Sequence, residues 1–320
     1  MKIFLRSAIL LAAPLLHAAE PVRPSLILVR GANGSAEYVT RFDSQVQSWQ
    51  KAAGRAGADI LLPIPTATPP PAGETDLARL ERVLADLPKV GPAPVWLVLI
   101  GHGTWDGKEA RFNLEGPDLS AAGLAGWLEP VQRPLVIINT SSSSAPFIPV
   151  LAGPNRTIIT ATRSGNERNY ARFGDWLAAS LEDAAADYDQ DGQASLLEWF
   201  LRANSRTTEF YLGDGRIQTE HALIDDNGDG KGTPAAWFRG LRATTKSKEN
   251  TPLDGSRSQQ QSLAPDAASQ QMTAAQLTER DRLEAEITSL REQKPKLPEA
   301  EYYGKLEALL RQMASFYGTP

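Results

Sequence analysis

Short apolar runs alternate with helix-like stretches through the first two thirds of the chain. Five runs rich in β-branched and leucine residues predict strands, at about 25–29, 59–63, 95–100, 134–138 and 157–160. The stretches between them predict helices, at about 38–56, 76–87, 119–127 and 171–182. Strands that are apolar on both faces and alternate with helices are typical of a parallel sheet covered on both sides. The pattern therefore predicts an α/β fold with a mostly parallel central sheet.

Two of the predicted strands run directly into polar residues. Gly101-His102-Gly103 follows the third run, and four consecutive serines, Ser141 to Ser144, follow the fourth. In parallel sheets the carboxyl ends of the strands meet at one edge, where ligands and catalytic groups gather. We therefore expect His102 and the serine hydroxyls to share one rim of the sheet, with the hydroxyls exposed to a ligand. A serine-rich turn that caps the next element is the competing interpretation.

The composition changes beyond Arg242. Residues 243–271 are polar and lack apolar periodicity, which predicts a flexible linker. Apolar positions then recur at helical spacing over 272–317, and Pro295 and Pro298 interrupt them, which predicts a helical hairpin. The two apolar stripes consist of Leu283, Ile287 and Leu290, and of Leu306, Leu309, Leu310, Met313 and Phe316. We interpret the hairpin as a coiled-coil module for docking or for self-association through these helices.

The first nineteen residues have the pattern of a secretory signal peptide. Lys2 and Arg6 precede an apolar stretch at 9–16, and Ala18 and Ala19 offer a cleavage site. The apolar stretch is too short to span a bilayer, and no other stretch is long and apolar enough to do so. The pattern predicts an exported protein, periplasmic or secreted, with no transmembrane segment after removal of residues 1–19. An N-terminal membrane anchor is the alternative interpretation.

Composition narrows the chemistry that the chain can perform. It has no cysteine, three histidines and a net charge of −5. Thiolate chemistry, cysteine–metal sites and disulfides are therefore excluded. One histidine lies in the predicted leader, so an imidazole-based mechanism has only His102 and His221 to use, and we expect His221 to be structural. No basic stripe is visible, which argues against nucleic acid as a partner.

Three segments resemble a known family. They are LVLIGHG at 97–103, VIINTSSSS at 136–144 and TATRSG at 160–165. Together they resemble the caspase-like fold of clan CD peptidases, and more closely its legumain-type (C13) branch and the bacterial homologues of that branch. The resemblance covers about residues 25–239. It implies a three-layer caspase-like α/β sandwich over 24–242, with the predicted hairpin as an appendage.

The resemblance also implies a set of site residues. In that family a histidine acts as general base or acid, a cysteine after the next strand attacks the substrate carbonyl, and backbone amides stabilise the oxyanion. The base would be His102, Gly103 would lend an amide, and the nucleophile position would fall on Ser141, or on Ser142 if the loop is one residue longer. A serine hydroxyl has a far higher pKa than a thiol, so a site built around a thiolate–imidazolium pair does not by itself activate it.

The missing cysteine decides between the functions that this resemblance allows. It favours a catalytically degenerate peptidase homologue that binds a peptide or a protein partner. The alternative is a serine-dependent hydrolase that uses Ser141 or Ser142 with His102. An α/β-hydrolase ranks lower, because the G-x-S-x-G nucleophile elbow of that fold is missing from the chain.

Residues 187–198, DYDQDGQASLLE, match the ligand positions of an EF-hand calcium loop. The predicted Ca²⁺ ligands are Asp187, Asp189, Asp191, the carbonyl of Gln193, Ser195 through water, and Glu198 as the closing bidentate ligand. Gly192 allows the sharp turn, whereas Ala194 replaces the apolar residue usual at its position. A solvated acidic turn is the competing interpretation, and it does not account for both Gly192 and Glu198.

A second acidic loop begins in the same way but ends differently. Asp225 to Gly230 has the spacing of the first half of a calcium loop. Ala236 stands where the closing carboxylate would be. The sequence leaves two interpretations of this loop open, a weak metal site and a simple turn.

Overall fold

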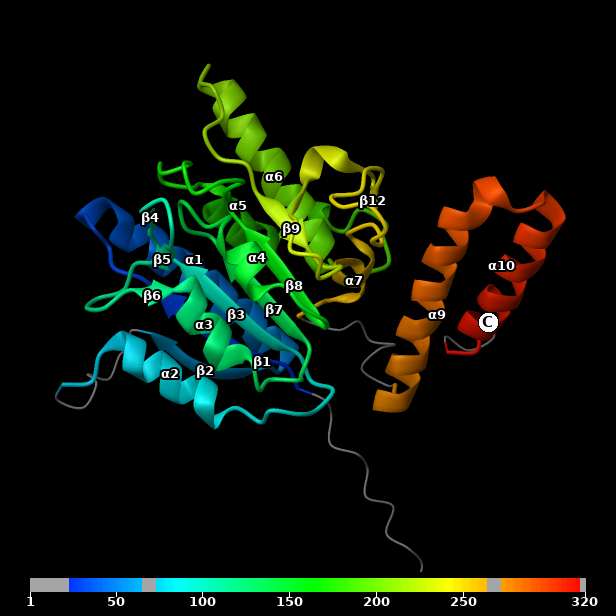
Figure 1. The fold of residues 1–320 in the computed structure, drawn as a ribbon, viewed down its shortest axis with the longest axis horizontal. Coiled ribbons are helices and arrows are strands. Elements are labelled where there is room, and N and C mark those ends of the chain that lie inside the picture. The colour runs from blue at the N-terminus through cyan, green and yellow to red at the C-terminus, as the bar shows by residue number, and fades with distance from the viewer. Residues whose placement is uncertain (1–22, 65–72, 264–271, 317–320) are drawn as a thin grey trace, which may run out of the picture.

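The computed structural model describes residues 23–64, 73–263 and 272–316 (Figure 1). The predicted signal peptide, residues 1–19, lies outside the described residues, so export stays a prediction. In the described part of the chain, no helix combines the length and the apolar character that crossing a bilayer requires.

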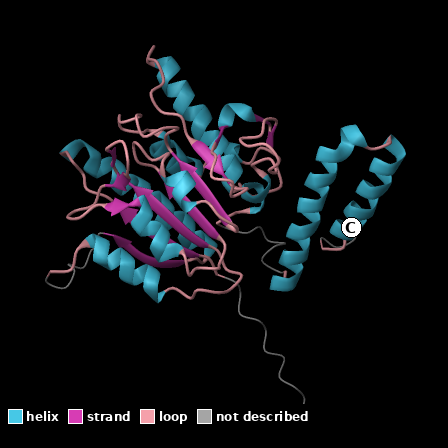
Figure 2. Ribbon diagram, viewed as in Figure 1, coloured by secondary structure: helices cyan, strands magenta, loops and turns pink. Residues whose placement is uncertain are grey.

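A seven-stranded sheet forms the centre of the domain (Figure 2). Its strands, in spatial order, are β10 (Thr233–Pro234), β9 (Leu223–Asp225), β8 (Arg156–Thr160), β7 (Leu135–Asn139), β3 (Val95–Ile100), β1 (Ser25–Arg30) and β2 (Asp59–Ile64). The five strands from β8 to β2 are parallel, whereas β9 and β10 pair antiparallel at one edge. The predicted mostly parallel sheet is therefore confirmed.

Helices cover both faces of this sheet, because every inner strand is apolar on both sides. One face carries α1 (Ala36–Ala56), α5 (Phe173–Ser180) and α6 (Leu196–Gly213), and the other carries α2 (Asp76–Asp86), α3 (Ala121–Leu128) and α4 (Phe147–Leu151). In β3, Trp96 and Val98 pack toward the first face, and Leu97 and Leu99 pack toward the second. The structure thus confirms the predicted three-layer α/β sandwich.

Side chains and glycine define the helix ends at the residues where the sequence pattern changes. Thr75 and Ser120 accept the backbone N–H groups of Ala78 and Gly123 and so cap α2 and α3. Gly57 ends α1 in the left-handed conformation, with φ of 60°. The helix predicted from residue 119 begins at 121, because 119–120 form a short strand.

Two small antiparallel sheets lie outside the central one. Strands β4 (Gly103–Trp105), β5 (Ala110–Phe112) and β6 (Leu119–Ser120) form the first, and β11 (Phe238–Arg239) and β12 (Arg242–Ala243) form the second. Short 3₁₀ turns occur at η1 (Ala184–Ala186), η2 (Ala235–Trp237) and η3 (Lys294–Lys296). The first small sheet matters for the site, because β4 follows His102 directly.

The predicted C-terminal hairpin is present and stands beside the sheet domain (Figure 1). It consists of α9 (Ala274–Gln293) and α10 (Glu299–Ala314), and both prolines fall in or next to the turn between them. Leu283, Ile287 and Leu290 of α9 are buried, as their spacing predicts. Tyr303 and Leu310 of α10 are exposed. Self-association through these helices stays a prediction.

Part of the predicted linker differs from expectation. Residues 264–271 lie outside the described residues, but 253–263 pack onto the domain and include α7 (Ser256–Gln260). Asp254 accepts N–H groups from Asp226 and Asn227, and the Asp226 carboxylate accepts those of Gly255 and Ser258. Buried carboxylates therefore order a polar segment that has no apolar periodicity.

This carboxylate cluster makes the stability of the domain depend on pH. Asp225 and Asp254 are 0% and 3% exposed. Burial raises the pKa of Asp225 to about 6, and burial followed by the charge of Asp226 raises that of Asp254 to about 7. The native state thus holds protons that the unfolded chain releases near pH 4. The contribution to stability is complete below that pH and is lost as the pH rises to about 7.

We therefore predict that Asp254→Asn reduces the loss of stability between pH 5 and pH 8 by about 1–3 kcal/mol, since one pKa unit corresponds to about 1.4 kcal/mol. Urea unfolding at both pH values in buffer with a chelator measures this loss. Asp86→Asn, at the exposed end of α2, is the control and should leave the pH dependence unchanged. Equal pH dependence in the wild type and Asp254→Asn would contradict the prediction.

Candidate functional site

The pairing of β3 with β7 brings His102 and the serine run to one rim of the sheet. Leu99 lies opposite Asn139 in the parallel ladder, and the N–H of Thr140 donates to the carbonyl of Leu99 over 3.0 Å. Both strands therefore end at the same height. Beyond them, the backbone N–H of Gly103 lies 3.3 Å from the hydroxyl of Ser142.

The serine run is buried, so the expectation of exposed hydroxyls is wrong. Ser141 and Ser142 are 1% and 4% exposed. The Ser141 hydroxyl donates to the side-chain oxygen of Asn139 over 2.6 Å, and the Ser142 hydroxyl donates to the carbonyl of Gly103 over 3.1 Å. Strand β4 lies over these two groups, whereas the buried Ser143 hydroxyl has no hydrogen-bond partner among the described residues. The run forms a hydrogen-bonded turn beneath β4.

Glycine is required at position 103 because the backbone of β4 passes so close to the serine run. A Cβ atom there would collide with the carbonyl oxygen of Ser142 and would lie 2.6 Å from the Ser141 hydroxyl oxygen. Any larger residue would push β4 away from β7. Gly103 therefore allows the backbone of β4 to lie directly against the serine run.

His102 is half-buried in an aromatic surround. Its ring centroid lies 4.5 Å from that of Tyr38, 5.2 Å from that of Phe42 and 6.1 Å from that of Tyr170. Its Nε2 lies 3.2 Å from the carbonyl oxygen of Asn33 and donates to it, because a carbonyl can only accept. Burial lowers the pKa of His102 and so favours the neutral form of the ring.

The imidazole is not hydrogen-bonded to the serines. Its only hydrogen-bond partner among the described residues is Asn33, whereas Ser141 and Ser142 bond to Asn139 and Gly103. The structure thus places all four predicted catalytic positions at one rim without linking base to nucleophile. A hydroxyl attacks efficiently only when a base within about 2.6–3.2 Å takes its proton.

Glu167 joins three segments at the same rim. The sequence pattern does not predict this role. Its side chain lies 2.6 Å from His221 Nδ1 and accepts the backbone N–H of His221 over 3.1 Å. Its carbonyl accepts the N–H of Ser143 over 2.9 Å. The TATRSG segment lies just before Glu167, but no local pattern pairs residues 54 positions apart. His221 therefore anchors the turn through Glu167.

The first acidic loop gathers half of its predicted calcium ligands. Carboxylate oxygens of Asp187, Asp189 and Asp191 lie within 4.8 Å of one another. Burial, together with neighbouring carboxylates, raises the pKa values of Asp189 and Asp191. Clustered carboxylates with raised pKa values suit a hard cation with oxygen ligands, such as Ca²⁺.

Ser195 and Glu198 serve a different purpose from the one predicted. Glu198 is 1% exposed, and one of its oxygens accepts both the N–H and the hydroxyl of Ser195. The other accepts the N–H of Tyr188 over 2.7 Å. Ser195 and Glu198 thus form the capping box that begins α6. The backbone N–H of Gln193 donates to the Asp191 carboxylate over 2.9 Å.

The second acidic loop has the hydrogen bonding of a turn. The Asp225 carboxylate accepts the N–H groups of Gly228 and Gly230, over 2.8 and 2.9 Å. Asp229 accepts the N–H of Lys231 and the hydroxyl of Thr251. These contacts form a hydrogen-bonded turn, and the weak metal site stays an untested alternative.

Comparison with known proteins gives a distant structural likeness. No protein-family model matches the sequence, and no curated protein matches it. The fold is similar to the crystal structure of the Drosophila initiator caspase Dronc, with 12% identity and a TM-score of 0.42 over 64% of this chain and 79% of that one. It is also similar to caspase-1 from Spodoptera frugiperda, with 10% identity and a TM-score of 0.42 over 69% and 94% of the two chains. Both of these neighbours are caspases.

Because β4 lies so close to the serine run, we predict that adding one methyl group at position 103 destabilises the fold. Gly103→Ala should lower the free energy of unfolding by about 1–3 kcal/mol, as overpacking does elsewhere. Gly54→Ala is the matched control, because that glycine lies in exposed helix with open space around it and should gain about 0.5–1 kcal/mol. Denaturant unfolding measures both, and a neutral Gly103→Ala would contradict the described packing.

Proposed function

We propose that this chain is an exported caspase/legumain-like peptidase homologue that has lost catalysis and binds a peptide or a protein partner at the His102 rim. The observation that supports it is the bonding of the two candidate nucleophiles. Ser141 and Ser142 are buried and donate to Asn139 and Gly103, while His102 bonds to Asn33. The candidate base and the candidate nucleophiles each hydrogen-bond to another residue and not to one another. This arrangement favours a binding function over acyl transfer.

The aromatic wall at the rim supports a role in recognition. Tyr38, His102 and Tyr170 are each partly exposed and lie in mutual ring contact. Aromatic side chains supply large contact area and are enriched at binding surfaces. A neutral His102 presents no charge that would resist burial beneath a partner.

Loss of catalysis predicts that a fluorophosphonate probe labels neither Ser141 nor Ser142. Labelling is read by mass spectrometry of the purified protein, with an active serine hydrolase added to the same sample as the positive control. Labelling that disappears in His102→Ala and in either Ser141→Ala or Ser142→Ala would replace the proposal with the serine-dependent hydrolase.

Binding is measured separately, by fluorescence polarisation with a dye-labelled peptide library. Saturable binding is expected, and Tyr38→Ala should weaken it at least tenfold because the rim loses its aromatic wall. Tyr303→Ala, on the exposed face of α10, is the control and should have no effect. Absence of any saturable binding would remove the peptide from the proposal.

We also infer that the first acidic loop binds Ca²⁺. Asp187, Asp189 and Asp191 would hold the ion, and Glu198 would complete the shell only by leaving its place in the capping box of α6. Bound calcium would offset two of the three negative charges of these carboxylates. The proximity of these carboxylates and the raised pKa values of Asp189 and Asp191 support the inference.

Calorimetry with CaCl₂ should give a saturable heat with the wild type and none with Asp189→Asn. The melting temperature should rise with calcium, since an ion at 100 times its Kd stabilises the native state by about 2.7 kcal/mol. Asp214→Asn, an exposed acid at the end of α6, is the control and should bind as the wild type does. No heat with the wild type would reject the calcium site.

A further inference from the structure

A cavity of about 400 Å³ opens beside the aromatic wall of His102. Tyr38 belongs both to this wall and to the lining of the cavity. The lining is rich in cationic and hydroxyl groups and contains a single carboxylate, that of Glu37. The groups that matter are Arg41, Arg172 and Arg216, with the phenols of Tyr38, Tyr170 and Tyr211.

Arg172 lines this cavity and also the neighbouring one that Phe210 lines. Its guanidinium lies 4.2 Å above the ring of Phe210, and no ion pair joins it to a carboxylate of the described residues. It is half-buried, so water compensates its charge only in part. A half-buried guanidinium in this state is ready to accept an anion.

The nearest carboxylate is already occupied. Glu220 is buried, and its oxygens accept the backbone N–H groups of Arg172 and Phe173 over 2.9 and 2.8 Å and the hydroxyl of Tyr211 over 3.0 Å. These donors hold Glu220 beneath the start of α5. The Arg172 backbone N–H donates to Glu220, and the charge of its guanidinium counteracts part of the rise that burial causes in the pKa of that carboxyl.

The two other arginines stand at the mouth of the cavity with weak competition. Arg41 lies 3.1 Å from Asp175, whose other oxygen accepts from Gln45 and Tyr170. Arg216 is exposed and lies 3.7 Å from Asp214. Exposed pairs of this kind contribute about 0–1 kcal/mol, so both guanidinium groups can turn toward a ligand at little cost.

We propose that this cavity, the Arg172 pocket, binds the oxyanion of a small molecule, a carboxylate or a phosphate group. Guanidinium forks match both groups with paired hydrogen bonds. The volume suits a ligand of the size of a small metabolite. The pocket shares Tyr38 and Tyr170 with the aromatic wall, but binding of an oxyanion does not require that the rim bind a peptide.

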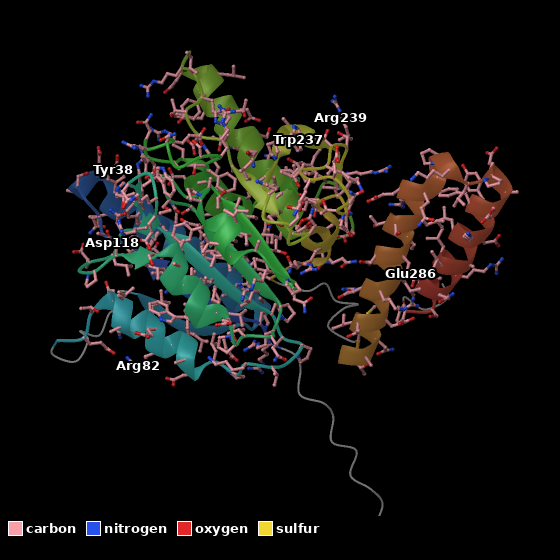
Figure 3. The ribbon with its side chains drawn as sticks, viewed as in Figure 1. Tyr38, Arg82, Asp118, Trp237, Arg239 and Glu286 are labelled. Carbon is pink, nitrogen blue, oxygen red and sulfur yellow. The ribbon has the colours of Figure 1, made fainter. Side chains whose placement is uncertain are left out.

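Isothermal titration calorimetry with sodium phosphate and with sodium succinate, at constant ionic strength set by NaCl, tests the proposal. At least one of the two should bind the wild-type protein saturably, and the tighter of them identifies the group. Arg172→Gln should weaken binding at least tenfold. Arg82→Gln is the control. Arg82 lies on α2, on the other face of the sheet, and is paired with Glu74 (Figure 3).

A second variant covers the case in which Arg172→Gln disturbs the packing on Phe210. Ile217 lines the pocket and is 89% exposed, so Ile217→Glu adds a carboxylate at the mouth without affecting the core. It should weaken oxyanion binding at least threefold through repulsion. No saturable binding to the wild type, or equal affinity in the wild type and both variants, would overturn the Arg172 pocket and would leave the peptide-binding proposal untouched.

Discussion

The parallel pairing of β3 with β7 is the constraint on which the rest of the site depends. It sets the ends of the two strands at one height, so that the residues after Ile100 and after Asn139 must meet. The glycine at position 103 then lets β4 pass directly over the serine run. The same close approach that creates the rim also covers the hydroxyls of Ser141 and Ser142, because β4 lies over them. The arrangement that brings His102 near the serine run therefore also shields the serine hydroxyls from solvent.

Buried carboxylates organise the segments that have no apolar pattern of their own. Glu198 ties the first acidic loop to α6, and Glu220 holds the start of α5. Asp226 and Asp254 do the same for residues 253–263. Each accepts several backbone N–H groups, which offsets the cost of burying an ionised group. Carboxylates that accept backbone N–H groups thus order the loops of this domain. They also make its stability depend on pH.

Opposite charges are sorted to different parts of the molecule. The acidic loops follow α5 and β9, whereas three arginines and three tyrosines surround the cavity beside His102. Since the net charge is −5, this basic cavity is a local exception in an acidic protein. A half-buried guanidinium is stabilised when an anion lies beside it, which gives the cavity a physical reason to bind an oxyanion. The rim combines this basic cavity with a neutral imidazole.

The sequence by itself determined the α/β class, the five parallel strands and the hairpin, because apolar periodicity and proline placement are local signals. It also placed His102 and the serine run at one rim, since strand ends in a parallel sheet follow from strand order. Only the tertiary structure decided that the serines are buried, that Glu198 caps α6, that residues 253–263 join the domain and that Glu167 meets His221. These outcomes depend on hydrogen bonds between residues far apart in the chain, or on which of two competing partners a polar group chooses, and periodicity carries no information about either.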